Sequence, residues 1–168
     1  MKIERIWAMP SAWTFTIKPI KELLKEEMSS GYIWVDPFAG MNSPAHLTND
    51  IRPEMKAKYH LDALDFLKAI KTESVDGVLF DPPYSPRQVS EHYKSVGRKA
   101  TAMDTSARFY SVLKDEIKRI LKPGGKAICF GWNTMGIGKT RGFEMTRVLI
   151  VPHGGAKNDT LCTVEIKQ

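Results

Sequence analysis

Two predominantly apolar runs constrain the fold of this chain more than any other feature. Tyr32–Val35 and Val75–Phe80 are each followed at once by Asp-Pro, at Asp36-Pro37 and Asp81-Pro82. Such runs are typical of strands buried on both faces of a parallel sheet, because those strands have no polar side. Ligands of open parallel sheets lie beyond the carboxyl ends of the strands. Both Asp-Pro pairs are therefore expected to border one cleft.

Helical patterns alternate with these strands. Pro19–Met28 and Ser106–Leu121 place apolar residues on one face, and Lys126–Phe130 is a further buried strand. Met145–Val151 and Thr160–Ile166 have the pattern of a closing antiparallel pair. The alternation predicts an α/β fold with a doubly wound, mostly parallel sheet and an antiparallel terminal strand pair. We expect a single domain over residues 1–168.

The remaining segments are assigned from shorter patterns. Ala45–Ile51 and Tyr59–Leu64 are expected to be short strands, Asp65–Ile70 a short helix and Pro53–Lys58 a helical turn. Residues 1–15 are expected to form an irregular lid or a short edge element. Residues 85–105 are polar and basic without a steady period, and we interpret them as a mobile loop.

Composition narrows the function only broadly. The net charge of +6 and pI near 9.3 suit a polyanionic partner, although such an excess equally serves solubility. No run approaches the about 20 apolar residues of a membrane helix, and the N-terminus lacks an apolar signal core, so a cytoplasmic protein without a membrane partner is expected. Cys129 and Cys162 lie in strand patterns and are predicted to be core thiols, with no metal site.

Asp81-Pro82-Pro83-Tyr84 carries the strongest chemical signal. The exocyclic amine of a base is a poor nucleophile because its lone pair is delocalised into the ring. The Asp81 carboxylate and the Pro82 carbonyl can accept hydrogen bonds from both amino hydrogens and so localise that lone pair, while proline stiffens the turn. Tyr84 offers a face for base stacking, worth about 1–3 kcal/mol. The alternative is a rigid turn with a packing tyrosine.

Acidic residues after the other strands suggest a cofactor pocket. Asp36 can accept a hydrogen bond from the cationic amino-acid end of a methyl donor, and Asp50 from ribose hydroxyls. Asp62 can accept from the adenine amino group of that donor. Gly40 allows close backbone approach, and Phe38 can pack on the donor. Each acid alone is better explained as a helix cap or a solvated surface group. Three of them, each after an apolar strand pattern, together favour a pocket.

The order of DPFAG, NDI, LDAL and DPPY resembles the S-adenosylmethionine-dependent amino-methyltransferases of DNA, and the adenine-N6 enzymes are the most similar. The resemblance extends from about Ile17 to Ile166, and includes the helix Thr16–Met28 and the turn Leu121–Gly125. It implies a class I methyltransferase (Rossmann-like) fold and S-adenosylmethionine as cofactor. The implied catalytic residues are Asp81, Pro82, Pro83 and Tyr84. The implied cofactor-binding residues are Asp36, Pro37, Phe38, Ala39, Gly40, Asn42, Asp50, Ile51, Asp62, Ala63 and Leu64.

The chain departs from the family pattern in two places. Asn42 stands where the cofactor loop usually has a glycine, and only nine residues separate Gly40 from Asp50. Met41–Pro44 is therefore expected to replace the usual helix by a turn. The chain also lacks a separate target-recognition domain, which leaves the 85–105 segment for substrate contact.

Basic residues gather in and beside that segment. We expect five of them to contact phosphates around an extruded base: Arg87, Lys94, Arg98, Lys99 and Arg108. A solvated lid is the alternative, and His92 and Tyr93 equally suit a cover over the cofactor. Trp132 suits either the mouth of the cleft or the core.

The sequence thus favours methyl transfer from S-adenosylmethionine to an exocyclic amino nitrogen of a nucleic-acid base. Adenine N6 in DNA is the favoured acceptor. The alternatives are an RNA or small-molecule N-methyltransferase, and a non-catalytic nucleic-acid-binding subunit with the same fold. The protein is expected to be a monomer or a homodimer.

Overall fold

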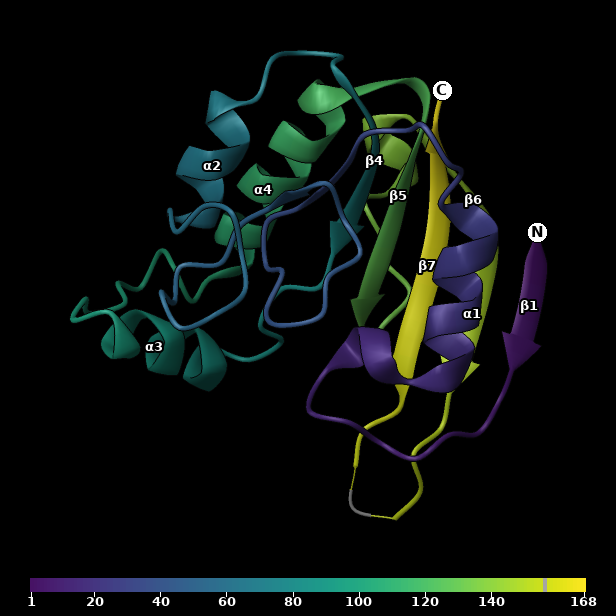
Figure 1. Ribbon diagram of the computed structural model, residues 1–168, viewed down its shortest axis with the longest axis horizontal. Helices are drawn as coiled ribbons and strands as arrows, with labels where there is room; N and C mark the ends of the chain where they lie inside the picture. Colours follow the sequence, from purple (N-terminus) through teal and green to yellow (C-terminus); the bar gives the residue numbers. More distant parts are fainter. Residues whose placement is uncertain (156) are drawn as a thin grey trace.

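The structure is a computed structural model that describes residues 1–155 and 157–168. Within them, seven strands form one sheet in the order β1-β6-β7-β5-β4-β2-β3 (Figure 1). The strands are β1 (Lys2–Arg5), β2 (Trp34–Asp36), β3 (Leu47–Thr48), β4 (Val75–Phe80), β5 (Leu121–Gly131), β6 (Phe143–Val151) and β7 (Thr160–Lys167). The α-helices are α1 (Lys18–Glu27), α2 (Ala63–Ala69), α3 (Pro86–Ser95) and α4 (Ala107–Ile120), and the 3-10 helices are η1 (Thr14–Thr16) and η2 (Lys139–Arg141).

The strand directions agree with the predicted fold class. β7 is antiparallel to its neighbours β5 and β6, whereas every other neighbouring pair is parallel. The predicted closing pair is therefore β6 and β7. Residues 1–15 do supply an edge element: β1 pairs with β6 at one end of the sheet (Figure 1).

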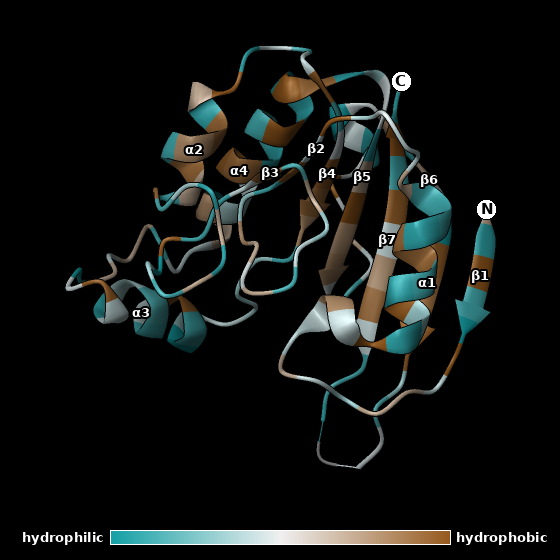
Figure 2. Ribbon diagram, in the orientation of Figure 1, coloured by the Kyte–Doolittle hydropathy of each residue, from teal (hydrophilic) through white to brown (hydrophobic). Residues whose placement is uncertain are grey.

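Helices cover both faces of the sheet because the strand residues alternate. Val78 and Phe80 of β4 pack with α2 and α4 on one face. Leu79, between them, faces α1 on the other, where it joins Trp34 and Ile20. The apolar stripe of α1 is visible in Figure 2. β2 and β4 also approach closely, because a Cβ at Gly77 would overlap the Trp34 indole.

The predicted strand Tyr59–Leu64 is wrong. Only an isolated bridge from Asn49 to Tyr59 remains of it. Asp62 is the N-cap of α2, where its carboxylate accepts a hydrogen bond at 3.0 Å from the Leu64 N–H. The capping side chain favours a helical start over continued extension. The predicted strand Ala45–Ile51 is likewise reduced to Leu47–Thr48, and turns without a helix occupy Pro53–Lys58.

The prediction of a mobile loop over residues 85–105 is also wrong, because α3 occupies Pro86–Ser95. Its first turn is a capping box: the Ser85 hydroxyl accepts from the Gln88 N–H at 3.2 Å, and the Gln88 side chain accepts from the Ser85 N–H. Pro86 at the first helical position has the φ that a helix needs. Ser85, Pro86 and Gln88 thus form a helix-start signal that does not depend on a steady period of apolar residues.

Along the described ranges, 1–155 and 157–168, no helix is both long enough and apolar enough to cross a membrane.

Candidate active site

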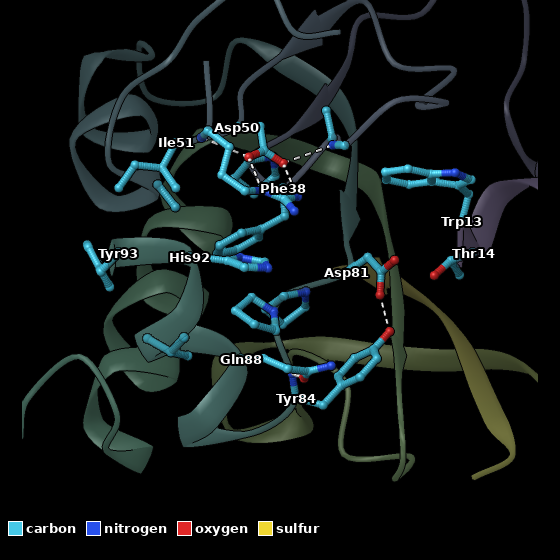
Figure 3. A pocket seen from close by; sticks show the side chains of 18 of the residues that line it. Trp13, Thr14, Phe38, Asp50, Ile51, Asp81, Tyr84, Gln88, His92 and Tyr93 are labelled. Carbon is cyan, nitrogen blue, oxygen red and sulfur yellow. Dashed lines mark hydrogen bonds and ion pairs between the residues drawn. The ribbon is translucent and has the colours of Figure 1, made fainter. Parts of the chain in front are cut away.

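A cavity of about 290 Å³ lies beyond the carboxyl ends of β2 and β4 (Figure 3). It brings together most of the residues that the motifs singled out. Those in its wall are Pro37, Phe38, Ala39, Gly40, Asn42, Asp50, Ile51, Asp62, Ala63, Asp81, Pro82, Pro83 and Tyr84. Both Asp-Pro turns therefore contribute to one cavity, as the strand pattern indicated.

Asp81 is a half-buried carboxylate at the end of β4. It accepts a hydrogen bond from the Tyr84 hydroxyl, and Figure 3 shows Thr14 pointing toward it from the opposite side. Burial raises the pKa of Asp81, and the hydroxyls of Tyr84 and Thr14 act in the opposite direction. Asp81 is thus a poorly hydrated acceptor at the cavity wall.

The two carbonyls of the Pro-Pro turn have different surroundings. The Pro83 carbonyl accepts a hydrogen bond from the Tyr110 hydroxyl of α4. The Pro82 carbonyl accepts none from residues 1–155 or 157–168. The turn is thus anchored at its second proline, and its first proline keeps an acceptor free.

Tyr84 is held on three sides. Its hydroxyl is bound to Asp81, and its N–H donates to the Gln88 side chain at 2.8 Å. Its ring centre lies 5.4 Å from that of Trp132 at an interplanar angle of 43°. Trp132 is 47% exposed, so it lies at the rim beside Tyr84 and not in the core.

Asp50 is fully engaged by neighbouring donors. Its carboxylate accepts from the Gly40 N–H at 3.1 Å, and from the N–H, Nε and Nη2 of Arg52 at 3.0 Å each. A carboxylate has about four acceptor sites, so the four donors occupy them all. Gly40 has a φ of +54°, and a Cβ there would lie 3.3 Å from Trp13.

Asp62 connects α2 with α3. Its Oδ2 accepts from the Tyr93 hydroxyl at 2.5 Å, and the Arg98 guanidinium lies 3.9 Å from the same oxygen. Arg98 also lies 5.1 Å from the centre of the Tyr93 ring. The neighbouring His92 is part of the cavity wall, where burial lowers its pKa. Tyr93 and His92 therefore form part of the cavity wall, in line with the alternative prediction that these two residues cover the cofactor.

Two predicted cofactor residues, Asp36 and Leu64, do not line this cavity within the described part of the chain. Asp36 is fully buried and accepts hydrogen bonds from the Phe38 N–H at 2.9 Å and the Ser43 hydroxyl at 2.6 Å. Burial raises its pKa to about 7. In this structure Asp36 therefore holds the turn after β2, which is short and non-helical as predicted.

The five predicted phosphate-binding residues lie outside the cavity wall. Arg87 pairs with Glu91 at 2.8 Å on the exposed side of α3, and Lys94, Lys99 and Arg108 are exposed. Arg98 alone turns back toward Asp62. Arg87, Lys94 and Arg108 are each next in sequence to a wall residue, at Gln88, Tyr93 and Phe109.

Several wall residues were missed by the motif analysis. Ala12, Trp13, Thr14 and Phe15 approach from the N-terminal segment, and Arg52, Gln88, Val89 and Phe109 line the cavity as well. His92 and Tyr93, which complete the wall, had been singled out in the sequence as an alternative cover. The aromatic pair Trp13 and Phe15 was the one available signal in the N-terminal segment, since it stands among few charges.

Sequence comparison finds no matching family model and no matching curated protein. The structure is similar to 1,6-didemethyltoxoflavin-N1-methyltransferase from Burkholderia thailandensis, solved with S-adenosylhomocysteine, with a TM-score of 0.59 and 12% identity over 90% of this chain and 77% of that one. It is also similar to TrmN from Thermus thermophilus, with a TM-score of 0.57 and 16% identity over 90% of this chain and 49% of that one. NSun6 from Pyrococcus horikoshii is similar with a TM-score of 0.53 and 13% identity, over 82% of this chain and 48% of that one.

These likenesses concern the fold. The chain has an α/β fold of the class I, Rossmann-like methyltransferase type, as its sequence predicted. It spans about half the length of TrmN and NSun6.

Proposed function

We propose that this protein transfers a methyl group from S-adenosylmethionine to an exocyclic amino nitrogen of a nucleic-acid base, with adenine N6 in DNA as the favoured acceptor. One observation carries the proposal: Asp81 and Pro82 both line the cavity, and no donor in the described residues engages the Pro82 carbonyl. Fold resemblance alone cannot assign a substrate, because one fold supports many reactions.

The acceptor geometry suits an amine conjugated with a ring. Two acceptors that bind both amino hydrogens draw the nitrogen toward a tetrahedral shape and return its lone pair to the nitrogen. The Pro82 carbonyl is held in place by the bond that Tyr110 makes to the next carbonyl, so it needs little reorganisation. Tyr84 is held by its hydroxyl and its N–H, and Trp132 packs at a tilt against its ring. In this proposal the ring surface that Trp132 leaves uncovered stacks on the base.

The other end of the cavity fits the methyl donor. S-adenosylmethionine, when bound, supplies a methyl group activated by its sulfonium. Asp50, which follows β3, and Asp62, which caps α2, both line the cavity. Gly40 leaves the backbone open where a side chain would meet Trp13. All acceptor sites of the Asp50 carboxylate are engaged. Asp50 can therefore accept hydrogen bonds from ribose hydroxyls only if Arg52 stops donating to it.

The cations near the rim favour a polyanionic substrate over a small molecule. Arg87, Lys94, Lys99 and Arg108 are exposed, and all but Lys99 are next in sequence to a residue of the cavity wall. In this proposal they contact the phosphates that flank the target base, while the base enters the cavity.

A small heterocyclic amine is the second candidate acceptor. The Burkholderia neighbour is by name an N1-methyltransferase and was solved with 1,6-didemethyltoxoflavin bound. In this chain the entrance carries no added target-recognition domain within residues 1–155 and 157–168. A free nucleoside would satisfy the Asp81–Pro82 acceptors as well as a nucleotide in DNA.

The proposal is tested by incubating the protein with tritiated donor and, separately, double-stranded DNA, single-stranded DNA, structured RNA and free nucleosides, followed by nucleoside analysis. We expect label in N6-methyladenine from DNA. Label found in RNA or in free nucleosides, and not in DNA, would show that the acceptor is RNA or a free nucleoside. Absence of label with every acceptor, together with absence of donor binding in calorimetry, would indicate a non-catalytic subunit and overturn the proposal.

A further inference from the structure

The free edge of strand β1 is a surface that the proposed function does not use. Among the described residues, β1 pairs with β6 on one side and has no strand on the other (Figure 1). Edge strands offer a row of backbone donors and acceptors to another chain, and proteins usually protect them with charges, prolines or covering elements.

The outward backbone groups of β1 can be identified from its pairing. The N–H groups of Ile6 and Ala8 donate to the Ile150 and Pro152 carbonyls, so the even-numbered residues face β6. Backbone direction alternates along a strand. The N–H and C=O of Ile3 and Arg5 therefore point away from the sheet, and in the described residues no backbone group pairs with them.

Large apolar side chains surround this edge. Met1 is 76% exposed, Ile3 61%, Trp7 60% and Met9 69%. Single exposed apolar residues are ordinary, but here two flank or lie in β1 (Met1 and Ile3) and two follow it within four residues (Trp7 and Met9). Figure 2 shows apolar colour directly after the polar strand β1, at the outer side of the sheet.

The charges of β1 favour a second copy of this chain as the partner. An antiparallel pair centred on Ile3 places Lys2 opposite Glu4 of the other copy, twice, because the arrangement is two-fold symmetric. Lys2 and Glu4 lie on the same side of the strand, where their side chains already form an ion pair at 3.0 Å. Ile3 would meet its own copy, and the outward N–H and C=O groups of both Ile3 residues would bond to each other.

Neighbouring registers are disfavoured by the same charges. A pair centred on Glu4 opposes two glutamates, and one centred on Arg5 opposes two arginines. Moving the centre from Ile3 to Glu4 slips the pairing by two residues and keeps every side chain on its own face, so the charges are what distinguish these registers.

We propose that two copies of this protein associate through antiparallel β1–β1 pairing centred on Ile3, which joins their sheets into one continuous sheet. The association is independent of methyl transfer, because none of its residues lines the cavity.

Charge exchange tests this register. In the proposed register, K2E places glutamate opposite glutamate at two positions, and E4K places lysine opposite lysine at two positions. Each variant alone should therefore dimerise at least tenfold more weakly than the wild type, a change of about 1.4 kcal/mol or more. In an equimolar mixture, the two acidic side chains of a K2E copy would face the two lysines of an E4K copy, so heterodimers should form. Analytical ultracentrifugation of untagged protein should show the mass rising with concentration from 19.0 kDa toward twice that value for the wild type and the mixture only.

Two further variants separate interface loss from misfolding. I3P removes an N–H that points outward, and so leaves the bonds to β6 intact, whereas I3V keeps it. I3P should be monomeric and I3V dimeric, with circular dichroism like that of the wild type in both. E4K loses its bond to Arg147, so only recovery in the mixture counts for that variant. A wild type that stays at 19.0 kDa at all concentrations, or a K2E variant that dimerises as well as the wild type, would overturn the proposal.

Discussion

Two aspartates that each begin an Asp-Pro turn after a strand have different surroundings. Asp36 is enclosed and bonded to its own turn, whereas Asp81 borders the cavity with Tyr84 and Thr14 beside it. The sequence shows the same Asp-Pro pair after both strands. What it could not show is which carboxylate faces the cavity, because that depends on Ser43 reaching back to Asp36 across a turn of unusual length.

Tyr84→Phe should shift the acidic limb of the pH–rate profile to higher pH. Asp81 must be ionised to accept hydrogen bonds both from the Tyr84 hydroxyl and from the target amine. Activity therefore falls as pH drops through the raised pKa of Asp81. The Tyr84 hydroxyl lowers that pKa, and its removal raises the pKa further. The measurement is kcat/KM against pH for wild type and Y84F. An acidic limb that stays in place, or moves to lower pH, would contradict the assigned contact.

Arg52→Ala should strengthen donor binding severalfold. The variant releases the two side-chain donors that occupy Asp50 and so frees acceptor sites for ribose hydroxyls. D50N is the matched comparison, because it removes the charge and should weaken binding. Calorimetry with S-adenosylmethionine measures both. If R52A weakened binding as much as D50N, the ion pair would itself support the donor and the ribose role of Asp50 would be wrong.

At the scale of elements, the long apolar patterns were predicted well and the short capped ones poorly. β4 was predicted with its observed bounds and the β6–β7 pair nearly so, because repeated apolar positions average over several residues. α2 and α3 begin at Asp62 and Ser85, where one side-chain cap decides between helix and extended chain. Whether these helices form depends on single side-chain hydrogen bonds, and a periodic apolar pattern carries no information about them.

Ser85→Ala should destabilise the first turn of α3 by about 1 kcal/mol. The variant removes the acceptor of the Gln88 N–H, and Gln88 in turn supports Tyr84 through the Tyr84 N–H. We expect faster amide exchange at Gln88 and Val89 and a higher KM for the acceptor, with donor affinity changed less. The control is S95A, at the other end of the helix. Equal effects of S85A and S95A would show that the capping box is not what positions α3.

At the scale of the molecule, the mostly parallel sheet and the helical layers on its two faces follow from the alternation of strands and helices, whereas the order of the strands was not predicted. The cavity also follows, since the ends of parallel strands meet there. Its cover was predicted only as one of two alternatives each time, for a lid at residues 1–15 and for His92 and Tyr93. Trp13 and Phe15 reach it from a segment that precedes α1, and Tyr93 reaches Asp62 across 31 residues, which are contacts that only the assembled chain defines.

Asp36→Asn should make stability less dependent on pH. In the folded protein burial raises the pKa of Asp36 from 3.8 to about 7, so the folded state favours the protonated acid. The contribution of this group is therefore fully present below about pH 4 and is lost as pH rises to about 7. Urea unfolding at intervals from pH 4 to 8 should show a smaller decline for D36N than for wild type. A steeper decline for D36N would contradict the assigned direction.

The most direct test of the account is methyl transfer by D81N and D81A, with donor affinity measured on the same samples. D81A removes one of the two acceptors on which nitrogen activation depends, and D81N replaces the carboxylate by a neutral amide whose oxygen is a weaker acceptor, while Asp50 and Asp62 remain. We expect transfer to fall at least 100-fold in both variants, about 2.7 kcal/mol in the barrier, with donor affinity within a few fold of wild type. Near-normal transfer by either variant, on the acceptor that the wild type modifies, would contradict the central claim.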